Sequence, residues 1–149
     1  MDISKFKHKI VEVVKFHEVD MLGVCNNSVY FTYFEDARIQ YLHDLKLNFT
    51  LSEILNGSSF VIMAHNECDY LEPAVLSDEL NVYTRIDFIK NTSFGLKHLV
   101  ENVKTGRIIA KGSGVMVHID KQSKTPIPIL EEFYAAVKSI ESEVKILKV

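Results

Sequence analysis

The segment after residue 27 constrains the fold most strongly, because its apolar residues recur at helical spacing and many of them are aromatic. The residues three and four apart are Tyr30, Phe34, Ala37, Tyr41 and Leu45, and the face is widened by Val29, Phe31, Tyr33 and Leu42. Asn27 precedes them and suits an N-cap. Exposing this surface to water would cost about 25 cal/mol per Å². The pattern therefore predicts a long helix enclosed by a curved sheet.

Five other segments have the composition and alternation of β-strands. They are residues 7–16, 60–71, 80–89, 94–103 and 107–119. In 80–89 the even-numbered residues are mostly apolar and the odd-numbered ones polar, which is the period of a half-buried strand. Short turns at 91–93 and 104–106 join the last three strands as hairpins. With no linker or repeat, residues 1–149 are expected to form a single α+β domain with an antiparallel sheet.

A second helix is predicted near the end of the chain, after Pro126 and Pro128. Its apolar stripe consists of Leu130, Phe133, Val137, Ile140, Val144 and Leu147. Such a narrow seam suits docking on the body of the domain or on a partner subunit.

Composition excludes several classes of protein. The formal net charge is -3 and 47% of the residues are hydrophobic, as in ordinary globular proteins and unlike strongly basic nucleic-acid binders. The N-terminus lacks the apolar run of a signal peptide, and no stretch approaches the roughly 18 apolar residues of a membrane span. Cys25 and Cys68 are too few for a disulfide framework. We therefore expect a cytoplasmic protein with ordinary thiols and no membrane span.

Several familiar motifs are absent, among them the phosphate-binding Gly-x-x-x-x-Gly-Lys loop and the Gly-x-Ser-x-Gly elbow. The run 112–114 reads Gly-Ser-Gly within a strand, where close packing of strand against helix explains it. His65, Cys68 and Asp69 have the residue types of a zinc site. Positions 65 and 68 differ by an odd number, however, so their side chains leave opposite faces of a regular strand. No metal site is expected.

Two acids stand before the predicted helix. Glu18 and Asp20 are followed by Gly23 and by the pair Asn26 and Asn27. The residues alone leave two interpretations open: a pair of carboxylates on one side of the chain, or a solvated loop whose acids are favoured by the helix dipole.

The run from Phe16 to Arg38 resembles the signature of the 4-hydroxybenzoyl-CoA thioesterase family. The shared pattern is an acid, a second acid, glycine, an apolar residue, Asn-Asn and Tyr, followed by Phe-Glu-x-Ala-Arg. A weaker similarity continues through 90–94 and 120–128. The resemblance implies a hotdog fold, in which a five- or six-stranded antiparallel sheet wraps a long helix. It also implies a homodimer with a continuous sheet and two active sites at its interface.

The same resemblance implies roles for individual residues. Asp20 matches the catalytic carboxylate, as nucleophile or general base, and Glu18 is a further catalytic candidate that stands where the family usually has Asp. Asn27 would orient the substrate carbonyl or water, or cap the helix. Gly23, Tyr30 and Ser59 are expected near the substrate, with Tyr30 serving packing more than chemistry. The residues expected to hold the phosphates and pantetheine of coenzyme A are Lys90, Asn91 and Ser93, with Lys97 and Lys111 as further candidates.

The expected activity is hydrolysis of an acyl-CoA thioester, with coenzyme A entering as part of the substrate and no separate cofactor. Two alternatives act on related molecules: a thioesterase for acyl groups on acyl carrier protein, and a hotdog module that binds an acyl thioester without hydrolysing it. A hydratase or dehydratase is conceivable on the same fold. Such enzymes usually place a His in the site, where this chain has Asp and Asn. A tetramer of two dimers is a further possibility.

Overall fold

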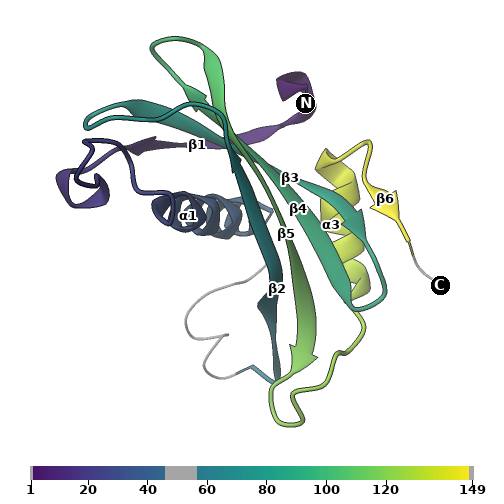
Figure 1. The fold of residues 1–149 in the computed structure, drawn as a ribbon. Coiled ribbons are helices and arrows are strands. Elements are labelled where there is room, and N and C mark those ends of the chain that lie inside the picture. Colours follow the sequence, from purple (N-terminus) through teal and green to yellow (C-terminus); the bar gives the residue numbers. More distant parts are fainter. Residues whose placement is uncertain (1, 46–56, 148–149) are drawn as a thin grey trace.

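The computed structural model describes residues 2–45 and 57–147, which form one sheet, two α-helices and two short 3₁₀ turns (Figure 1). The sheet order is β1-β3-β4-β5-β2, with β6 beside β3. The strands are β1 (His8–Val13), β2 (Ser59–Tyr70), β3 (Glu79–Ile89), β4 (Ser93–Asn102), β5 (Arg107–Asp120) and β6 (Lys145–Ile146). All neighbouring strands are antiparallel except β6, which pairs with β3 in parallel.

The predicted strands are confirmed, with one difference at the first. It was expected to reach residue 16 but ends at Val13, and the 3₁₀ turn η2 (Phe16–Glu18) follows. The Lys15 amide donates to the Glu18 carboxylate over 2.8 Å, which closes this turn. The chain is thereby bent away from the sheet, and apolar content alone could not show the bend.

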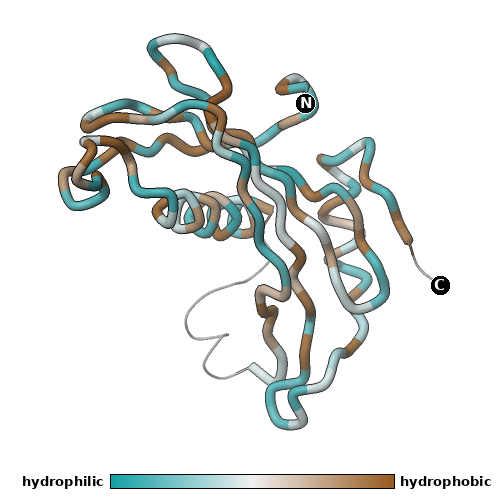
Figure 2. Tube along the Cα trace, viewed as in Figure 1, coloured by the Kyte–Doolittle hydropathy of each residue, from teal (hydrophilic) through white to brown (hydrophobic). Residues whose placement is uncertain are grey.

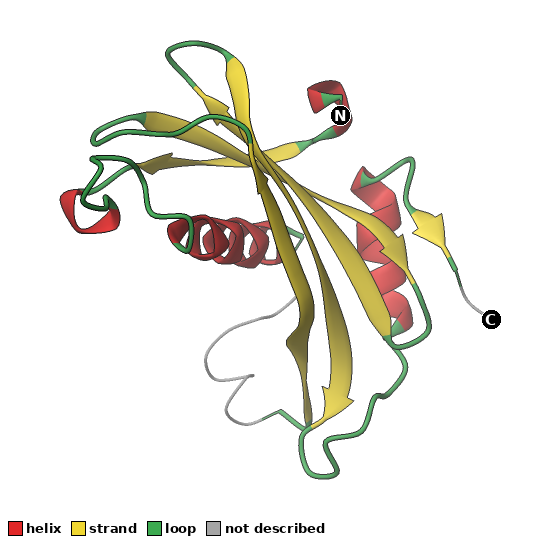
Figure 3. Ribbon diagram, in the orientation of Figure 1, coloured by secondary structure: helices red, strands yellow, loops and turns green. Residues whose placement is uncertain are grey.

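Helix α1 (Val29–Asp44) is enclosed by the curved sheet, as its aromatic residues predicted (Figure 3). Its buried residues are Tyr30, Tyr33, Phe34, Ala37, Arg38, Tyr41 and Leu42. The ring of Phe34 stacks on His98 of β4, with the ring centroids 4.5 Å apart. Burial of His98 lowers its pKa to about 3, so the stacked imidazole is neutral at physiological pH.

The backbone of β5 approaches Phe34 so closely that only glycine fits there. A Cβ atom at Gly112 would lie 2.3 Å from Cε2 of the Phe34 ring. The prediction that the Gly-Ser-Gly run serves close packing of strand against helix is confirmed at Gly112. Gly114 has a different neighbourhood, the backbone of His65 and the side chain of Met63.

The C-terminal helix is shorter than predicted. Helix α3 (Glu131–Ile140) docks on the body of the domain through Phe133, Tyr134 and Val137. Val144 and Leu147, which continue the helical spacing in the sequence, lie beyond it, and β6 begins at Lys145. The prediction of a helix through residue 147 was therefore wrong.

The helix ends where Glu141 turns inward. One oxygen of its carboxylate, Oε2, accepts hydrogen bonds from the Tyr41 hydroxyl at 2.8 Å and from the Ile86 amide at 3.0 Å. β1 pairs with β3 as far as Thr84, and β6 pairs with it from Phe88. Glu141 therefore fills the gap between two strands on one edge of β3.

Replacing Gly112 by Ala should destabilise the fold by about 1–3 kcal/mol, since the new methyl group must displace a fully buried aromatic ring. Urea unfolding followed by circular dichroism measures the change, with Ser113→Ala as the neighbouring control. Adding Phe34→Leu should recover part of the loss. Equal stability of Gly112→Ala and the parent chain would contradict the close contact.

Stability should also depend on pH through Glu12 of β1. Burial, then hydrogen bonding with Asp36 of α1 and the charge of Asp36, raise the pKa of Glu12 from 4.5 to about 7. Because the folded chain holds this proton more tightly than the unfolded chain, the contribution of Glu12 to the free energy of unfolding should fall as pH rises from about 4.5 to about 7, whereas the contribution of His98, whose pKa is lowered, rises with pH up to about 6.5. Glu12→Gln should remove that decline, whereas the strand variant Glu79→Gln should keep it. Thermal melting between pH 4 and 8 checks this, and an unchanged slope in Glu12→Gln would refute the assignment.

Candidate active site

Asp20 lies in a tight turn whose backbone fixes the direction of its carboxylate. The Asp20 amide donates to the Val24 carbonyl at 2.8 Å, and Gly23 closes the turn with a φ of +79°, which favours glycine. Inside the turn, Oδ1 of Asp20 accepts from the amide of Leu22 at 2.8 Å and more weakly from that of Val24 at 3.4 Å. The carboxylate is therefore oriented by its own loop.

The turn is anchored on both sides. Val19 bridges to Cys25 and Val24 bridges to Val75. The Cys25 amide donates to the Ala74 carbonyl at 2.7 Å, so the turn rests on the segment that leads into β3. These bonds join Asp20 to the sheet, although its side chain is in a loop.

Glu18, the other acid of the motif, has a different environment. It is 8% exposed, and its Oε1 accepts from the Tyr33 hydroxyl and from the Lys15 amide, both at 2.8 Å. Burial, followed by the hydrogen bond with Glu18, raises the pKa of Tyr33. The Glu18 carboxylate thus ties η2 to α1, while Asp20 is open to solvent.

The start of α1 differs from the prediction. Ser28, not Asn27, is the residue before the helix, and the side chain of Asn26 binds the Ser28 amide at 3.1 Å and its hydroxyl at 3.0 Å. The prediction of Asn27 as the N-cap was therefore wrong, because the helix begins one residue later than expected. Asn27 is exposed, and its carbonyl instead accepts from the Tyr70 hydroxyl at 2.7 Å.

The first amides of the helix already have partners. The amides of Val29, Tyr30 and Phe31 donate to carbonyls three residues earlier, over 3.0, 3.4 and 3.2 Å. The helix start therefore does not present a row of unbound N–H groups to a substrate oxyanion in this conformation.

Tyr30 is a packing residue in this structure. It is 2% exposed and makes edge contacts with the rings of Tyr33 at 6.0 Å and Tyr70 at 5.2 Å between centroids. Burial raises the pKa of its hydroxyl. Tyr70 reaches the same place from the end of β2, a contact that sequence reasoning missed because it depends on strand register.

Large apolar side chains stand close to Asp20 in the sequence and are open to water in the single chain. Phe16 is 81% exposed, Met21 104% and Leu22 86%. Figure 2 shows hydrophobic stretches in the loops around η2 and the start of α1. Three such side chains beside one carboxylate form an exposed apolar patch of the kind that marks an interface.

The residues expected to hold coenzyme A lie at the opposite end of the sheet. Lys90, Asn91 and Ser93 form the β3–β4 hairpin, whose Thr92 carbonyl accepts from the His118 amide at 2.8 Å. His118 in turn lies 2.8 Å from the Ser59 hydroxyl. Ser59 and Tyr70 are the first and last residues of β2, so about 36 Å separates them at about 3.3 Å per residue. One chain brings Ser59 together with the hairpin, but not with Asp20.

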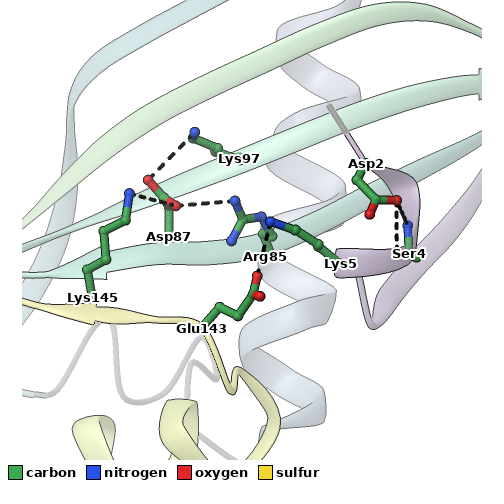
Figure 4. A network of polar contacts seen from close by, with 8 residues as sticks. All are labelled: Asp2, Ser4, Lys5, Arg85, Asp87, Lys97, Glu143 and Lys145. Atoms are coloured by element: carbon green, nitrogen blue, oxygen red, sulfur yellow. Dashed lines mark hydrogen bonds and ion pairs between the residues drawn. The ribbon is translucent and has the colours of Figure 1, made fainter.

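The further lysine candidates occupy other places. Lys97 belongs to an ion network on the sheet (Figure 4). The Asp87 carboxylate at its centre lies 3.7 Å from Lys97, 3.2 Å from Arg85 and 3.9 Å from Lys145. A cavity of about 310 Å³ next to Arg85 is lined by charges of both signs and by no residue of the Asp20 turn. Lys111 stands on β5 opposite Asp69 of β2.

Within residues 2–45 and 57–147, no three His, Cys, Asp or Glu side chains gather closely enough to hold a metal ion. His65 instead lies 3.7 Å from the Glu67 carboxylate. Both cysteines are free. In the same part of the chain, no helix has the length and hydrophobicity needed to cross a membrane.

Sequence reasoning missed the partner of Ser59. His118 reads as one of six scattered histidines, and only the antiparallel register of β2 and β5 brings it to Ser59. Glu141 was missed for a similar reason, since its partners Tyr41 and Ile86 are distant in the chain.

Comparisons with known proteins agree with this architecture. A protein of Bacillus subtilis (strain 168) described as uncharacterized protein YsmA is 34% identical over 119 residues, which cover 80% of this chain and 77% of that protein. A crystal structure of a thioesterase from Thermus thermophilus, complexed with coenzyme A and Zn, is 30% identical with a TM-score of 0.79. The match covers 94% of this chain and 98% of that one.

The fold is also that of Slr0204, a 1,4-dihydroxy-2-naphthoyl-CoA thioesterase from Synechocystis. The TM-score is 0.83 at 17% identity, over 90% of this chain and 97% of that one. The predicted hotdog fold is thereby confirmed. The sequence model of the Thioesterase-like superfamily matches residues 14–137. The chain therefore belongs to the Thioesterase-like superfamily, as a thioester hydrolase.

Proposed function

We propose that this protein hydrolyses acyl-CoA thioesters to a free acid and coenzyme A, with Asp20 as the reacting carboxylate. The observation that carries the proposal is the Asp20 turn, in which two amides orient Oδ1 within a chain of the Thioesterase-like superfamily. The Thermus thermophilus relative, which binds coenzyme A, supports this carrier for the acyl group.

The chemistry suits a fixed carboxylate. With Oδ1 bound by its own loop, Oδ2 is the oxygen that meets the substrate or a water molecule. As a nucleophile it would attack the acyl carbon and release coenzyme A thiolate when the C–S bond breaks, and water would then hydrolyse the resulting anhydride to the free acid and restore Asp20. As a general base it would take a proton from the water that attacks instead. A thiolate is a good leaving group, so neither route needs a strong acid in the site.

We further propose that the working unit is a homodimer. Asp20 is open to solvent in one chain, whereas thioester chemistry gains from exclusion of water. Phe16, Met21 and Leu22 provide an apolar surface that a second copy would cover. β2 is an edge strand that pairs only with β5 among the described strands, and a twelve-residue open edge is a ready surface for another strand.

Pairing of two β2 edges around a two-fold axis would complete the site. Antiparallel pairing brings the Ser59 end of one β2 beside the Tyr70 end of the other, and Tyr70 is bonded to Asn27. The β3–β4 hairpin of one chain would then lie near the Asp20 turn of its partner. In that arrangement Lys90 would bind a phosphate of coenzyme A, and Asn91, Ser93 and Ser59 would contact its pantetheine arm.

The choice of carrier follows from charge. Acyl carrier proteins are acidic, and this chain has a formal net charge of -3. Because both partners are negatively charged, electrostatic attraction does not favour their association. Hydrolysis by this route needs no cofactor beyond the coenzyme A of the substrate. The two free cysteines suit the reducing cytoplasm, where we expect the protein to act.

Asp20→Asn should lower kcat for acyl-CoA hydrolysis by about 100-fold or more, because the amide is neither a nucleophile nor a base. Free thiol release is followed over a panel of aliphatic and aromatic acyl-CoA compounds and acyl carrier protein conjugates. Glu132→Gln, an exposed acid on α3, is the control and should keep full activity. Retained activity in Asp20→Asn would remove Asp20 from the mechanism. Binding of acyl-CoA by the parent chain without any thiol release would favour a binding module.

Two inactive variants should restore activity when they share a dimer. In a mixed dimer, one chain carries Asp20→Asn and the other carries both Lys90→Ala and Ser93→Ala. One of the two composite sites is then intact, because it combines the Asp20 of the second chain with the hairpin of the first. Co-refolded equal amounts should therefore regain about a quarter of the parent activity, since half of the dimers are mixed. Sedimentation checks that the proteins are dimers, and each variant refolded alone is the control. Dimers without restored activity would show that each site uses the hairpin of its own chain.

A further inference from the structure

A serine and a histidine that could act together in catalysis lie at the end of the sheet far from Asp20 of the same chain. Nε2 of His118 on β5 is 2.8 Å from Oγ of Ser59 on β2, and Nδ1 of the same ring is 3.0 Å from the Pro128 carbonyl oxygen. The His118 imidazole therefore links the Ser59 hydroxyl to the Pro128 carbonyl through two hydrogen bonds.

The carbonyl determines the tautomer of the ring. A carbonyl oxygen only accepts hydrogen bonds, so Nδ1 of His118 must carry the hydrogen that it donates to Pro128. In the neutral ring Nε2 then has a free lone pair and accepts the hydroxyl hydrogen of Ser59. This is the arrangement of a serine activated by a base that a third group orients, with a main-chain carbonyl in the orienting role.

Backbone hydrogen bonds hold all three groups in place. The His118 amide donates to Thr92 at 2.8 Å, and its carbonyl accepts from Ile127 at 2.9 Å. The Ile129 amide donates to Asn91 at 2.8 Å, which fixes the position of Pro128. Ser59 begins β2 opposite Asp120. Because the partners stand on two paired strands and on the segment between β5 and α3, the geometry does not depend on long mobile side chains.

Ser59 and His118 are accessible and distinct from the Asp20 turn. Each residue is partly exposed in the single chain. Within one chain, the length of β2 separates Ser59 from the Tyr70 end, where Asn27 and Asp20 lie. A reaction at Ser59 thus needs no contribution from the Asp20 of the same chain.

We infer that Ser59 is a second nucleophile of this protein, activated by His118, and that it accepts acyl groups from small activated esters and thioesters. Oγ of Ser59 attacks the acyl carbon while its proton moves to Nε2 of His118. The bond from the acyl carbon to the leaving oxygen or sulfur then breaks, and the leaving group takes the proton from Nε2. The product is an ester of Ser59, which water hydrolyses by the reverse proton path to release the acid and restore the serine.

The test uses the full chain with Asp20→Asn, so that its outcome does not depend on the proposed acyl-CoA hydrolysis. The protein is treated with 4-nitrophenyl acetate, the release of 4-nitrophenolate is recorded, and peptides are analysed by mass spectrometry. An acetyl group is expected on Ser59. His118→Gln should slow the acetylation by about 100-fold or more, as expected for loss of a general base.

Ser113→Ala is the matched control, because Ser113 is a partly exposed serine of the same sheet whose hydroxyl bonds to the Glu67 carboxylate at 2.6 Å rather than to an imidazole. Acetylation should be unchanged in Ser113→Ala and absent from residue 59 in Ser59→Ala, with both variants melting close to the parent temperature. Three outcomes would overturn the inference: no acetyl group on Ser59, an equal rate in His118→Gln, or equal modification of Ser113.

Discussion

The enclosure of α1 is the constraint on which the rest of the structure depends. A helix with three fully buried aromatic rings, Tyr33, Phe34 and Tyr41, is stable only if the sheet curves tightly around it. Such curvature requires the backbone of a strand to come close to the aromatic rings. Gly112 of β5 permits this approach to Phe34, because it has no Cβ atom. The stack of Phe34 on His98 then fixes β4 against the same turn of the helix. Sheet and helix therefore determine each other's position.

A buried carboxylate completes one edge of this sheet. Between His8, where β1 begins, and Lys145, where β6 begins, the edge of β3 would leave the Ile86 amide without a strand partner. Glu141 binds that amide and the Tyr41 hydroxyl together. Burial raises the pKa of Glu141, while the bonds from Tyr41 and Ile86 and the charge of Arg85 oppose the rise. The C-terminal segment is thus part of the core, because it supplies the group that links α1 to β3.

The sequence predicted those features that depend on local periodicity. Alternation located the strands, and aromatic spacing identified α1 as an enclosed helix. The same spacing led to the wrong end for α3, since Val144 and Leu147 fit a helical stripe although the inward turn of Glu141 has already ended the helix. The pair Ser59 and His118 required strand register, which no local pattern contains.

The Asp20 turn shows a different limit of local patterns. Acid, glycine and paired asparagines marked its position, but the direction of the carboxylate depends on the amides of Leu22 and Val24. Its openness to water, beside exposed Met21 and Leu22, is a property of one chain considered alone. In the proposed dimer a second copy would cover these side chains, and no pattern within one sequence shows such a contact.

The hydrogen bond from Tyr70 to Asn27 joins the last residue of the outer strand to the connection between the Asp20 turn and α1. A shift of that strand would therefore act on the connection between the Asp20 turn and α1 through the Tyr70 hydroxyl. In the proposed dimer, pairing of the two β2 strands and order in the Asp20 turn would be thermodynamically linked, and each would strengthen the other by the same factor. For that dimer, dilution would reduce turnover per chain as well as the fraction of paired chains.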